Sequence, residues 1–152
     1  MISLSLNGSW LLIHFPEGKH EPHAPETWRA LGEPIYEAYV PGNVELDLVR
    51  AGALPEPYVG SNIHGLRPLE THEWWYARSF QTPPAPVGTR WVLVFEGLDT
   101  LATVWLNGKQ VGESDNMLIE QRFEVSSSVR PGEENWLVVR LGSALNHARQ
   151  YE

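Results

Sequence analysis

The 152-residue chain contains no cysteine, and this absence excludes disulfide bonds and zinc sites built on thiolates. Long apolar stretches are also missing, because no run reaches the roughly 18 residues that a membrane-spanning helix needs. The first residues lack the basic segment followed by an apolar core that is typical of a secretory signal peptide. We therefore expect no membrane partner, and a cytoplasmic location is the default expectation.

Basic residues are scarce. Lysine and arginine total 11 against 19 aspartate and glutamate residues, so the formal net charge is −8 at pH 7. Binding to nucleic acid or to an anionic membrane requires a basic patch, so neither is an expected partner. The Gly-x-Ser-x-Gly motif of hydrolase nucleophiles and the glycine-lysine motif of phosphate-binding loops are both absent. No motif in the sequence predicts a cofactor.

Tryptophan, by contrast, is abundant, with 7 residues in a chain that is 42% hydrophobic. This content predicts one folded domain with a sizeable core rather than a disordered chain. Most of the tryptophans are expected to pack inside that core. The alternative interpretation is a carbohydrate-binding surface, on which flat indole rings stack against the apolar faces of sugars.

Turn signals at fairly regular spacing divide the chain into short alternating or aromatic segments. One short helix is expected at residues 43–52, where Asn43 can cap the N-terminus and Gly52 can end the helix. Long loops are expected at residues 16–34 and 55–68. The pattern predicts an all-β sandwich, with a jelly roll favoured over an immunoglobulin plan. Strands are expected at residues 4–15 with a bend near 7–8, and at 35–40, 73–81, 91–97, 102–107, 119–125 and 136–141.

A β-hairpin is predicted at Asn107-Gly108, because a type I′ turn requires positive φ at both central residues. Backbone conformation alone is expected to explain this turn. Upstream of the hairpin, residues 91–95 form a nearly continuous apolar run. Such a run predicts a strand that is buried on both faces or at its ends.

Two sets of side chains could carry chemistry. His14, His20 and His23 are close in the sequence, but they span an expected loop without the ligand spacing of a helical metal site. Carboxylates cluster near the hairpin, and a pair of them could hydrolyse a glycosidic bond if held about 5–10 Å apart around the sugar. Solvated strand and turn positions are the simpler interpretation, so we expect neither a catalytic residue nor a metal site here. The remaining histidines are expected in surface or loop positions: His64, His72 and His147.

Several short motifs occur in order along most of the chain. They are Leu6-Asn7-Gly8-Ser9-Trp10, Val40-Pro41-Gly42-Asn43-Val44, residues 52–58, Trp74-Trp75-Tyr76-Ala77-Arg78-Ser79-Phe80, residues 95–108 and Asp115-Asn116-Met117-Leu118. Together they resemble the N-terminal sugar-binding domain of family 2 glycoside hydrolases, most closely its β-mannosidase branch, with Leu118 in place of the usual phenylalanine. The positions that the resemblance marks as structural are Gly8, Trp10, Pro41, Gly42, Trp74, Tyr76, Gly97, Asp99, Asn107, Gly108 and Asn116.

The resemblance implies a galactose-binding-like jelly roll that serves a larger enzyme. In this family immunoglobulin-like sandwiches and a (β/α)8 barrel follow the domain, and the barrel carries the two carboxylates of a retaining mechanism. A barrel needs about 250 residues, so residues 1–152 are expected to be a single domain of a longer chain, inactive by itself. The expected partners are a carbohydrate and the catalytic barrel of the same parent chain.

The resemblance also implies how the domain meets sugar. An asparagine in the loop before the Trp-x-Tyr strand contacts the terminal sugar in the family, and Asn62 is the nearest match. A second contact, an aspartate in a Gly-Trp-Asp-Trp-Gly-Pro motif, would come after Glu152. The last strand of the sandwich is expected to be missing as well. A sheet edge left unpaired in this way favours self-association.

Several alternatives stay open. The parent enzyme could be a β-galactosidase, a β-glucuronidase or an exo-β-glucosaminidase, although Asp115-Asn116-Met117 favours a mannosidase. A free-standing carbohydrate-binding module would be a different class of protein. In a third class, the domain is a structural interface that never touches sugar.

Overall fold

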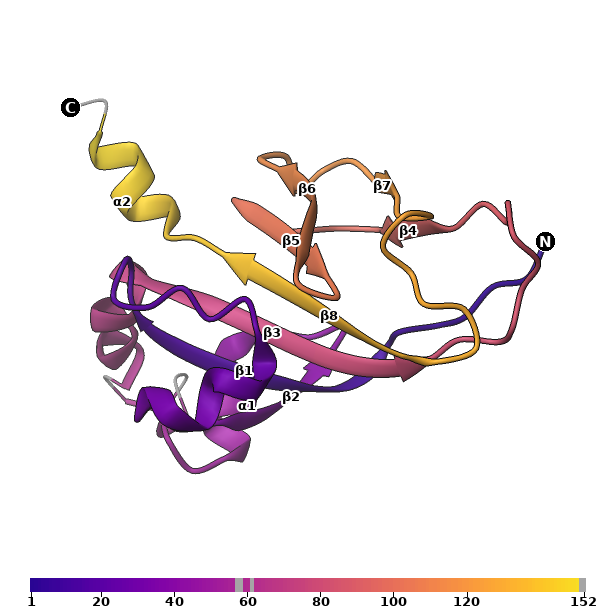
Figure 1. Cartoon of the computed structure of the whole chain (residues 1–152). Coiled ribbons are helices and arrows are strands. Elements are labelled where there is room, and N and C mark those ends of the chain that lie inside the picture. Colours follow the sequence, from indigo (N-terminus) through magenta and orange to yellow (C-terminus); the bar gives the residue numbers. More distant parts are fainter. Residues whose placement is uncertain (57–58, 61, 151–152) are drawn as a thin grey trace.

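The computed structural model describes residues 1–56, 59–60 and 62–150. Two antiparallel β-sheets form a sandwich, and short helices gather toward one end of it (Figure 1). Within the described ranges, every helix is too short or too polar to cross a membrane. The elements are β1 (Gly8–Pro16), η1 (a 3-10 helix, Pro25–Leu31), β2 (Tyr36–Val40), α1 (Val44–Arg50), η2 (a 3-10 helix, Asn62–Thr71), β3 (His72–Gln81), β4 (Val92–Phe95), β5 (Ala102–Leu106), β6 (Lys109–Ser114), β7 (Gln121–Glu124), β8 (Glu134–Leu141) and α2 (Ala144–Arg149).

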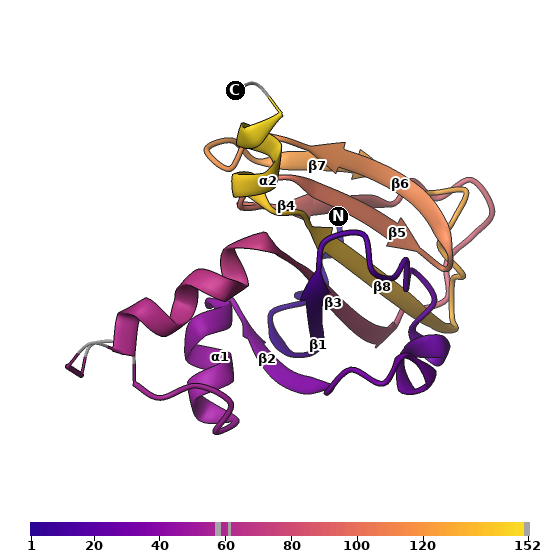
Figure 2. The same ribbon diagram turned by 90° about the vertical axis from the view of Figure 1, so that its left-hand side faces the viewer.

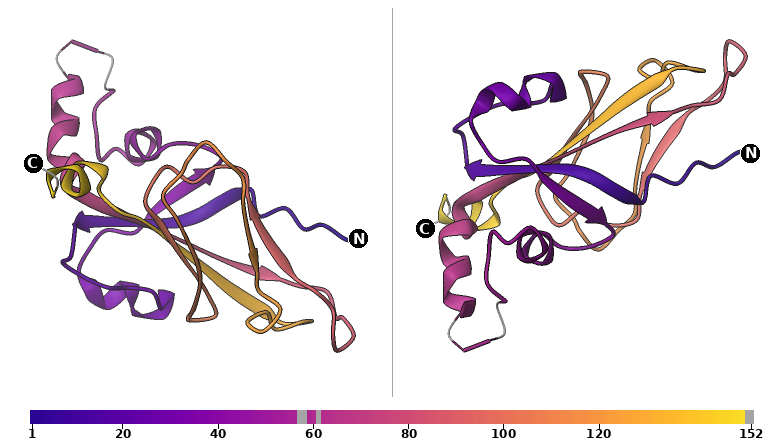
Figure 3. Two further views of the ribbon diagram at one scale, coloured as in Figure 1. Left: turned by 90° about the horizontal axis from the view of Figure 1, so that it is seen from above. Right: turned by 90° about the horizontal axis from the view of Figure 1, so that it is seen from below.

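The larger sheet has six strands in the order β2-β1-β3-β8-β5-β6, and the smaller sheet pairs β4 with β7. Figure 2 shows the smaller sheet lying over the β5–β6 end of the larger one. In Figure 3 the N-terminal segment leaves the sandwich at one end, while α2 and η2 lie at the opposite end. Helices η2 and α2 therefore share the end of the sandwich that is opposite the N-terminal segment.

Both faces of the larger sheet carry buried side chains. Trp10, Leu12 and Val104 face the smaller sheet and belong to the main core. The opposite face carries Trp75 and is covered by Trp28 of η1, whose indole lies in a second core. Side chains alternate between the two faces along each strand, so one strand contributes to both cores. Burying each large apolar side chain stabilises the fold by about 1.5–3 kcal/mol.

The predicted β-sandwich is confirmed, and the observed strands lie within a few residues of the expected ones. The first strand begins at Gly8 rather than at residue 4. The residues just before this strand are bound by a side chain, because Nη1 of Arg78 donates to the carbonyl oxygens of Leu6 and Asn7 at 2.6 and 2.7 Å. Those carbonyl groups are therefore held by a side chain of β3.

The expectation of one short helix needs correction. Helix α1 forms where it was predicted, and Oδ1 of Asn43 accepts a hydrogen bond from the Leu46 N–H at 2.9 Å. Among the described residues, three further segments are helical, namely η1, η2 and α2. Trp28 anchors η1, since its Nε1 donates to the Pro22 carbonyl at 2.7 Å. Ser143 caps α2 by accepting from the Asn146 N–H at 3.1 Å.

Strand β4 is buried neither on both faces nor at its ends, so that expectation is wrong. Val92 and Val94 are 38% and 41% exposed. Leu93 and Phe95, at the alternate positions, pack against the main core. The strand thus belongs to a sheet with one solvated face, although its sequence lacks the polar residues usual on such a face.

The β5–β6 turn has positive φ at Asn107 and Gly108, 51° and 83°, as predicted. Backbone conformation alone does not explain how this turn is held in place. Nδ2 of Asn107 donates to the Ser128 carbonyl at 2.7 Å and to Oδ1 of Asn135 at 2.8 Å. Oδ1 of Asn107 accepts from the Trp136 N–H at 3.0 Å. Because Asn135 is fully buried, the Asn107 side chain ties the turn to the interior of the sandwich.

The substitution Asn107→Gly separates these two roles, because glycine keeps the positive φ but removes three hydrogen bonds. We expect the free energy of unfolding to fall by about 1–3 kcal/mol, since buried polar partners are left unpaired. Urea denaturation measures this change. Asn7→Gly, at an exposed position whose side chain forms no hydrogen bond with the described residues, is the control and should stay within about 0.5 kcal/mol of the wild type. An Asn107→Gly protein as stable as the wild type would mean that turn conformation alone matters.

Candidate functional site

A cleft of about 610 Å³ is lined by residues of the larger sheet and of the segments next to α1, η2 and α2. Figure 2 shows these three helices on the same side of the molecule. This volume falls within the range of about 300–1,000 Å³ that is usual for ligand sites. Four chain segments meet there: residues 39–45 between β2 and α1, residues 66–72 at the end of η2, residues 95–100 between β4 and β5, and residues 139–144 between β8 and α2.

Aromatic side chains from neighbouring strands line the interior of the cleft. Trp74 and Tyr76 share a face of β3, and Trp10 comes from β1. The Trp10 ring meets Tyr76 edge to face, with the ring centroids 6.4 Å apart. Burial raises the pKa of Tyr76, and the Asp47 carboxylate acts in the same direction. The Tyr76 hydroxyl therefore stays protonated at neutral pH.

The turn between β2 and α1 reaches the cleft through Pro41 and Gly42, after a cis peptide bond between Val40 and Pro41. A Cβ added to Gly42 would lie 2.4 Å from the carbonyl oxygen of Tyr39, a contact that side chains do not tolerate. Helix α1 is held against β2 by Asp47, whose Oδ1 accepts from the Tyr39 N–H at 3.2 Å. The tight turn thus places the start of α1 at the mouth of the cleft.

Gly97 and Asp99 line the cleft from the segment between β4 and β5. Leu98 is buried in the main core and anchors that segment, while Asp99 is exposed. The Thr100 hydroxyl donates to the Asp99 carboxylate. A carboxylate is therefore presented to solvent at this side of the opening.

Two histidines on adjacent strands lie next to the aromatic lining. Nδ1 of His14 and Nδ1 of His72 are 2.8 Å apart, and His72 lines the cleft. His14 is stacked between Tyr36 and Trp74, with centroid distances of 5.9 and 4.5 Å. Burial, with a further effect of His72, lowers the pKa of His14 from 6.5 to about 4. The expectation of a surface or loop position for His72 is wrong, since it is a half-buried strand residue.

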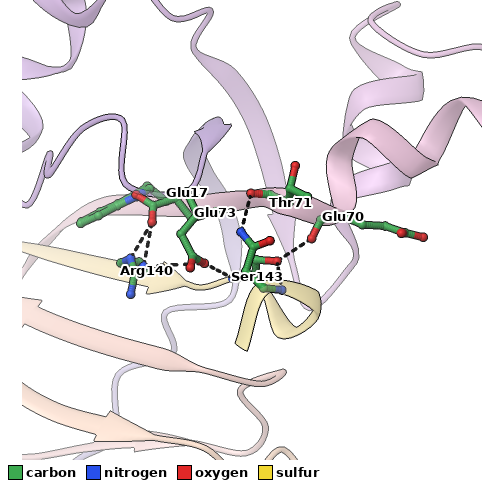
Figure 4. Close-up of polar contacts among 8 residues, drawn as sticks. Glu17, Glu70, Thr71, Glu73, Arg140 and Ser143 are labelled. Atoms are coloured by element: carbon green, nitrogen blue, oxygen red, sulfur yellow. Dashed lines mark hydrogen bonds and ion pairs between the residues drawn. The ribbon is translucent and has the colours of Figure 1, made fainter. Parts of the chain in front are cut away.

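A polar network fixes the C-terminal side of the opening (Figure 4). The Ser143 N–H donates to Oε2 of Glu17 at 2.5 Å, and the Ser143 hydroxyl donates to the Glu70 carbonyl at 2.6 Å. Asn146 adds a hydrogen bond to the Thr71 carbonyl at 3.4 Å. No residue of α2 is buried, so these polar contacts set where the helix begins.

The charged side chains among the described lining residues of the cleft are all acidic. Glu45, Glu70 and Asp99 belong to its lining, and the described lining residues include no lysine or arginine. The cleft therefore combines an aromatic interior with carboxylates that can accept hydrogen bonds, and it offers no cation to attract an anionic ligand. Such a surface suits a neutral, hydroxyl-bearing ligand better than an anion. In the ranges covered by the structure, histidine, aspartate and glutamate side chains form no cluster of three or more suited to a metal ion.

Seven of the eleven motif positions marked as structural meet in this cleft, although they are far apart in the sequence. Asn62 does not lie among the described lining residues. It sits at the start of η2, where its Nδ2 donates to the Glu56 carbonyl at 2.9 Å. The motif positions outside the lining are Gly8, Asn107, Gly108 and Asn116, and the lining positions are Trp10, Pro41, Gly42, Trp74, Tyr76, Gly97 and Asp99. The motif at 52–58 ends in residues outside the described ranges.

Sequence reasoning missed three residues of the site. His72 could have been placed by strand alternation, because it lies two residues before Trp74. Ser143 precedes residues 144–149 as a helix N-cap would, which is a readable local signal. Glu70 has no such signal, since its contribution depends on the path of η2.

Replacing Gly42 by alanine tests the tight turn at the cleft. We expect Gly42→Ala to lower the free energy of unfolding by more than about 1 kcal/mol, because its Cβ has no room. Gly65→Ala is the matched control, since a Cβ at Gly65 meets no atom within 4 Å. Thermal and urea unfolding of both variants give the comparison. Equal stability of the two variants would contradict the steric argument.

The histidine pair predicts a pH dependence of stability. The folded state holds the pKa of His14 below the ordinary 6.5, so the unfolded chain binds more protons as the pH falls from about 6.5 to about 4. Stability should therefore decrease across that range. Thermal midpoints measured between pH 7 and pH 4 should fall less steeply for His14→Gln than for the wild type, with His64→Gln as the control. Parallel curves for the wild type and His14→Gln would contradict this assignment.

Comparisons with known proteins agree with this geometry. A family profile described as "Glycosyl hydrolase 2 galactose-binding domain-like" matches residues 19–152. Beta-mannosidase B of Thermothelomyces thermophilus is 44% identical over 104 residues, which make up 68% of this chain and 12% of that protein. Beta-mannosidase B of Emericella nidulans is 35% identical over 127 residues, or 84% of this chain and 14% of that protein.

Solved structures share the fold. The crystal structure of the β-D-mannosidase from Dictyoglomus thermophilum matches 97% of this chain and 16% of its own, with a TM-score of 0.77 and 32% identity. The Ruminococcus gnavus β-glucuronidase matches 92% of this chain with a TM-score of 0.62 and 20% identity, which shows the fold alone. The chain spans only 12% and 14% of the two curated relatives named above. Since the profile covers most of its length, the chain belongs to the galactose-binding-like domain family of glycosyl hydrolase 2.

Proposed function

We propose that the chain is the N-terminal, sugar-binding accessory domain of a longer retaining exo-β-glycosidase of the β-mannosidase type. The observation that carries this proposal is the cleft, where seven residues of the family motifs meet around an aromatic interior. The catalytic carboxylates would lie in a barrel elsewhere in the parent chain. The domain would therefore bind and orient the terminal sugar, and it would not hydrolyse it alone.

The charge of the cleft supports a neutral sugar. Three carboxylates without a lysine or arginine among the described lining residues would repel a uronic acid, which carries its own carboxylate. A β-glucuronidase is therefore a weaker candidate than a β-mannosidase for the parent. The matched relatives named β-mannosidase point the same way.

Asn62 is proposed as the residue that meets sugar in the assembled enzyme. It begins η2, and Leu66, Leu69 and Glu70 of the same helix line the cleft. The Asn62 amide is tied to the Glu56 carbonyl through Nδ2, and no hydrogen bond to its Oδ1 is formed within the described residues. That oxygen is free to accept a hydrogen bond from a sugar hydroxyl.

The parent enzyme tests this function. Its hydrolysis of p-nitrophenyl β-D-mannopyranoside should exceed that of the β-galactoside and the β-glucuronide, and the 152-residue chain alone should be inactive. Asn62→Ala in the parent should lower kcat/KM about tenfold, as expected for one lost hydrogen bond to the reacting sugar. His64→Ala, an exposed change in the same helix, is the control.

Two results would contradict the proposal. An unchanged kcat/KM for Asn62→Ala would mean that the domain acts only as a scaffold. Tight binding of mannose by the isolated chain in calorimetry would instead favour a free-standing binding module, since an accessory domain that supplies part of a pocket binds weakly by itself.

A further inference from the structure

A second hollow lies on the face of the larger sheet that is opposite the cleft. We call it the sheet-face groove, and its volume is about 450 Å³. Strand alternation separates the two sites, because Trp74 and Tyr76 of β3 line the cleft whereas Glu73 and Trp75 line the groove. The loop after β1 forms its outer wall through His23.

Three stacked rings form the apolar side of the groove. Trp75 and Trp105 are nearly parallel, with centroids 5.2 Å apart, and His23 stacks on Trp105 at 5.7 Å. The stack runs from the fully buried Trp75 through the half-buried Trp105 to the exposed His23. An aromatic surface therefore continues from the core to the solvent.

A buried carboxylate holds a guanidinium at the base of the groove. Glu73 is 1% exposed, and its Oε2 accepts from Nε and Nη2 of Arg140 at 3.0 and 2.7 Å (Figure 4). Oε1 of Glu73 accepts from Nε1 of Trp75 at 2.9 Å. These bonds fix Arg140, whose side chain keeps 29% of its surface exposed. Its Nη1 forms no hydrogen bond with the described residues.

Other polar groups of the groove are also without partners in the described part of the chain. They are the indole N–H of Trp105, the hydroxyl of Thr103 and the imidazole of His23. On the rim, Oε1 of Glu113 accepts from Nε2 of Gln110 at 2.7 Å. Hydrogen-bond donors and acceptors thus surround the ring stack, and several are free to bind a ligand.

The charges of the groove indicate the kind of ligand. Glu21, Glu73 and Glu113 outnumber Arg140, which is already paired with Glu73. The excess negative charge disfavours phosphate, sulfate and uronic acids. A ligand with hydroxyl groups around an apolar face would use both the rings and the free polar groups.

We propose that the sheet-face groove is a second carbohydrate site, which binds a neutral pyranose unit. The sugar ring lies against the exposed His23 ring at the outer end of the stack, and its hydroxyls bind Nη1 of Arg140 and the Glu113 carboxylate. Every residue named for this site belongs to the present chain. The site would hold a polysaccharide chain on the face away from the cleft, and it does not depend on the parent enzyme's activity.

The isolated chain, labelled with 15N, tests the proposal by NMR. Methyl β-D-mannopyranoside should shift the indole N–H signals of Trp75 and Trp105 with a millimolar dissociation constant, corresponding to about −4 kcal/mol. The signals of Trp10 and Trp74 report on the cleft. His23→Ala and Glu113→Gln should each weaken binding about fivefold, as expected for one lost contact. His64→Ala is the exposed control and should bind like the wild type.

Three results would overturn the proposal. They are the absence of shifts at Trp75 and Trp105, shifts that persist unchanged in both groove variants, and stronger binding of methyl β-D-glucuronide than of the mannoside. Circular dichroism of each variant confirms that it is folded. Because the groove and the cleft lie on opposite faces, loss of binding at the groove leaves the Asn62 experiment unaffected. Failure of one proposal is thus distinguishable from failure of the other.

Discussion

The alternation of side chains along β3 is the constraint on which both surfaces of the molecule depend. β3 pairs with β1 on one side and with β8 on the other, so it is central to the larger sheet. Trp74 and Tyr76 point to the cleft, and Glu73 and Trp75 point to the sheet-face groove. A shift of one residue in the register of β3 would exchange these faces and bury the wrong side chains. Burial on both sides therefore specifies the register strongly.

Polar side chains then set the position of the segments around the sheet. Asn107 ties the β5–β6 turn to Asn135 in the interior. Ser143 ties the start of α2 to Glu17. These contacts join positions that are 28 and 126 residues apart in the sequence. A buried polar group without a partner raises the free energy of the folded state. Each such contact therefore favours one arrangement over its alternatives. The α2 side of the cleft is held by the Ser143 contacts more than by apolar packing, since α2 buries no side chain.

Local signals in the sequence were sufficient for much of the fold. The Asn107-Gly108 turn and the Asn43 cap depend on the conformation of a few neighbouring residues, and both are confirmed. The exposure of β4 could not be read locally, because a valine has the same β propensity on a covered face and on a solvated one. The 3-10 helix η1 was missed because the burial of Trp28 against the sheet, rather than helix propensity, holds it in place.

The sequence by itself determined the strand pattern, the hairpin, helix α1 and the family, because each depends on short stretches of residues in order. Only the tertiary structure decided that the scattered motif residues surround one cleft, that His14 and His72 share a contact, and that a second groove faces the other way. Those features depend on which strands become neighbours, and the order of strands in a sheet is set by packing of the whole chain. The sequence pattern of one strand does not indicate which other strands will lie beside it in the sheet.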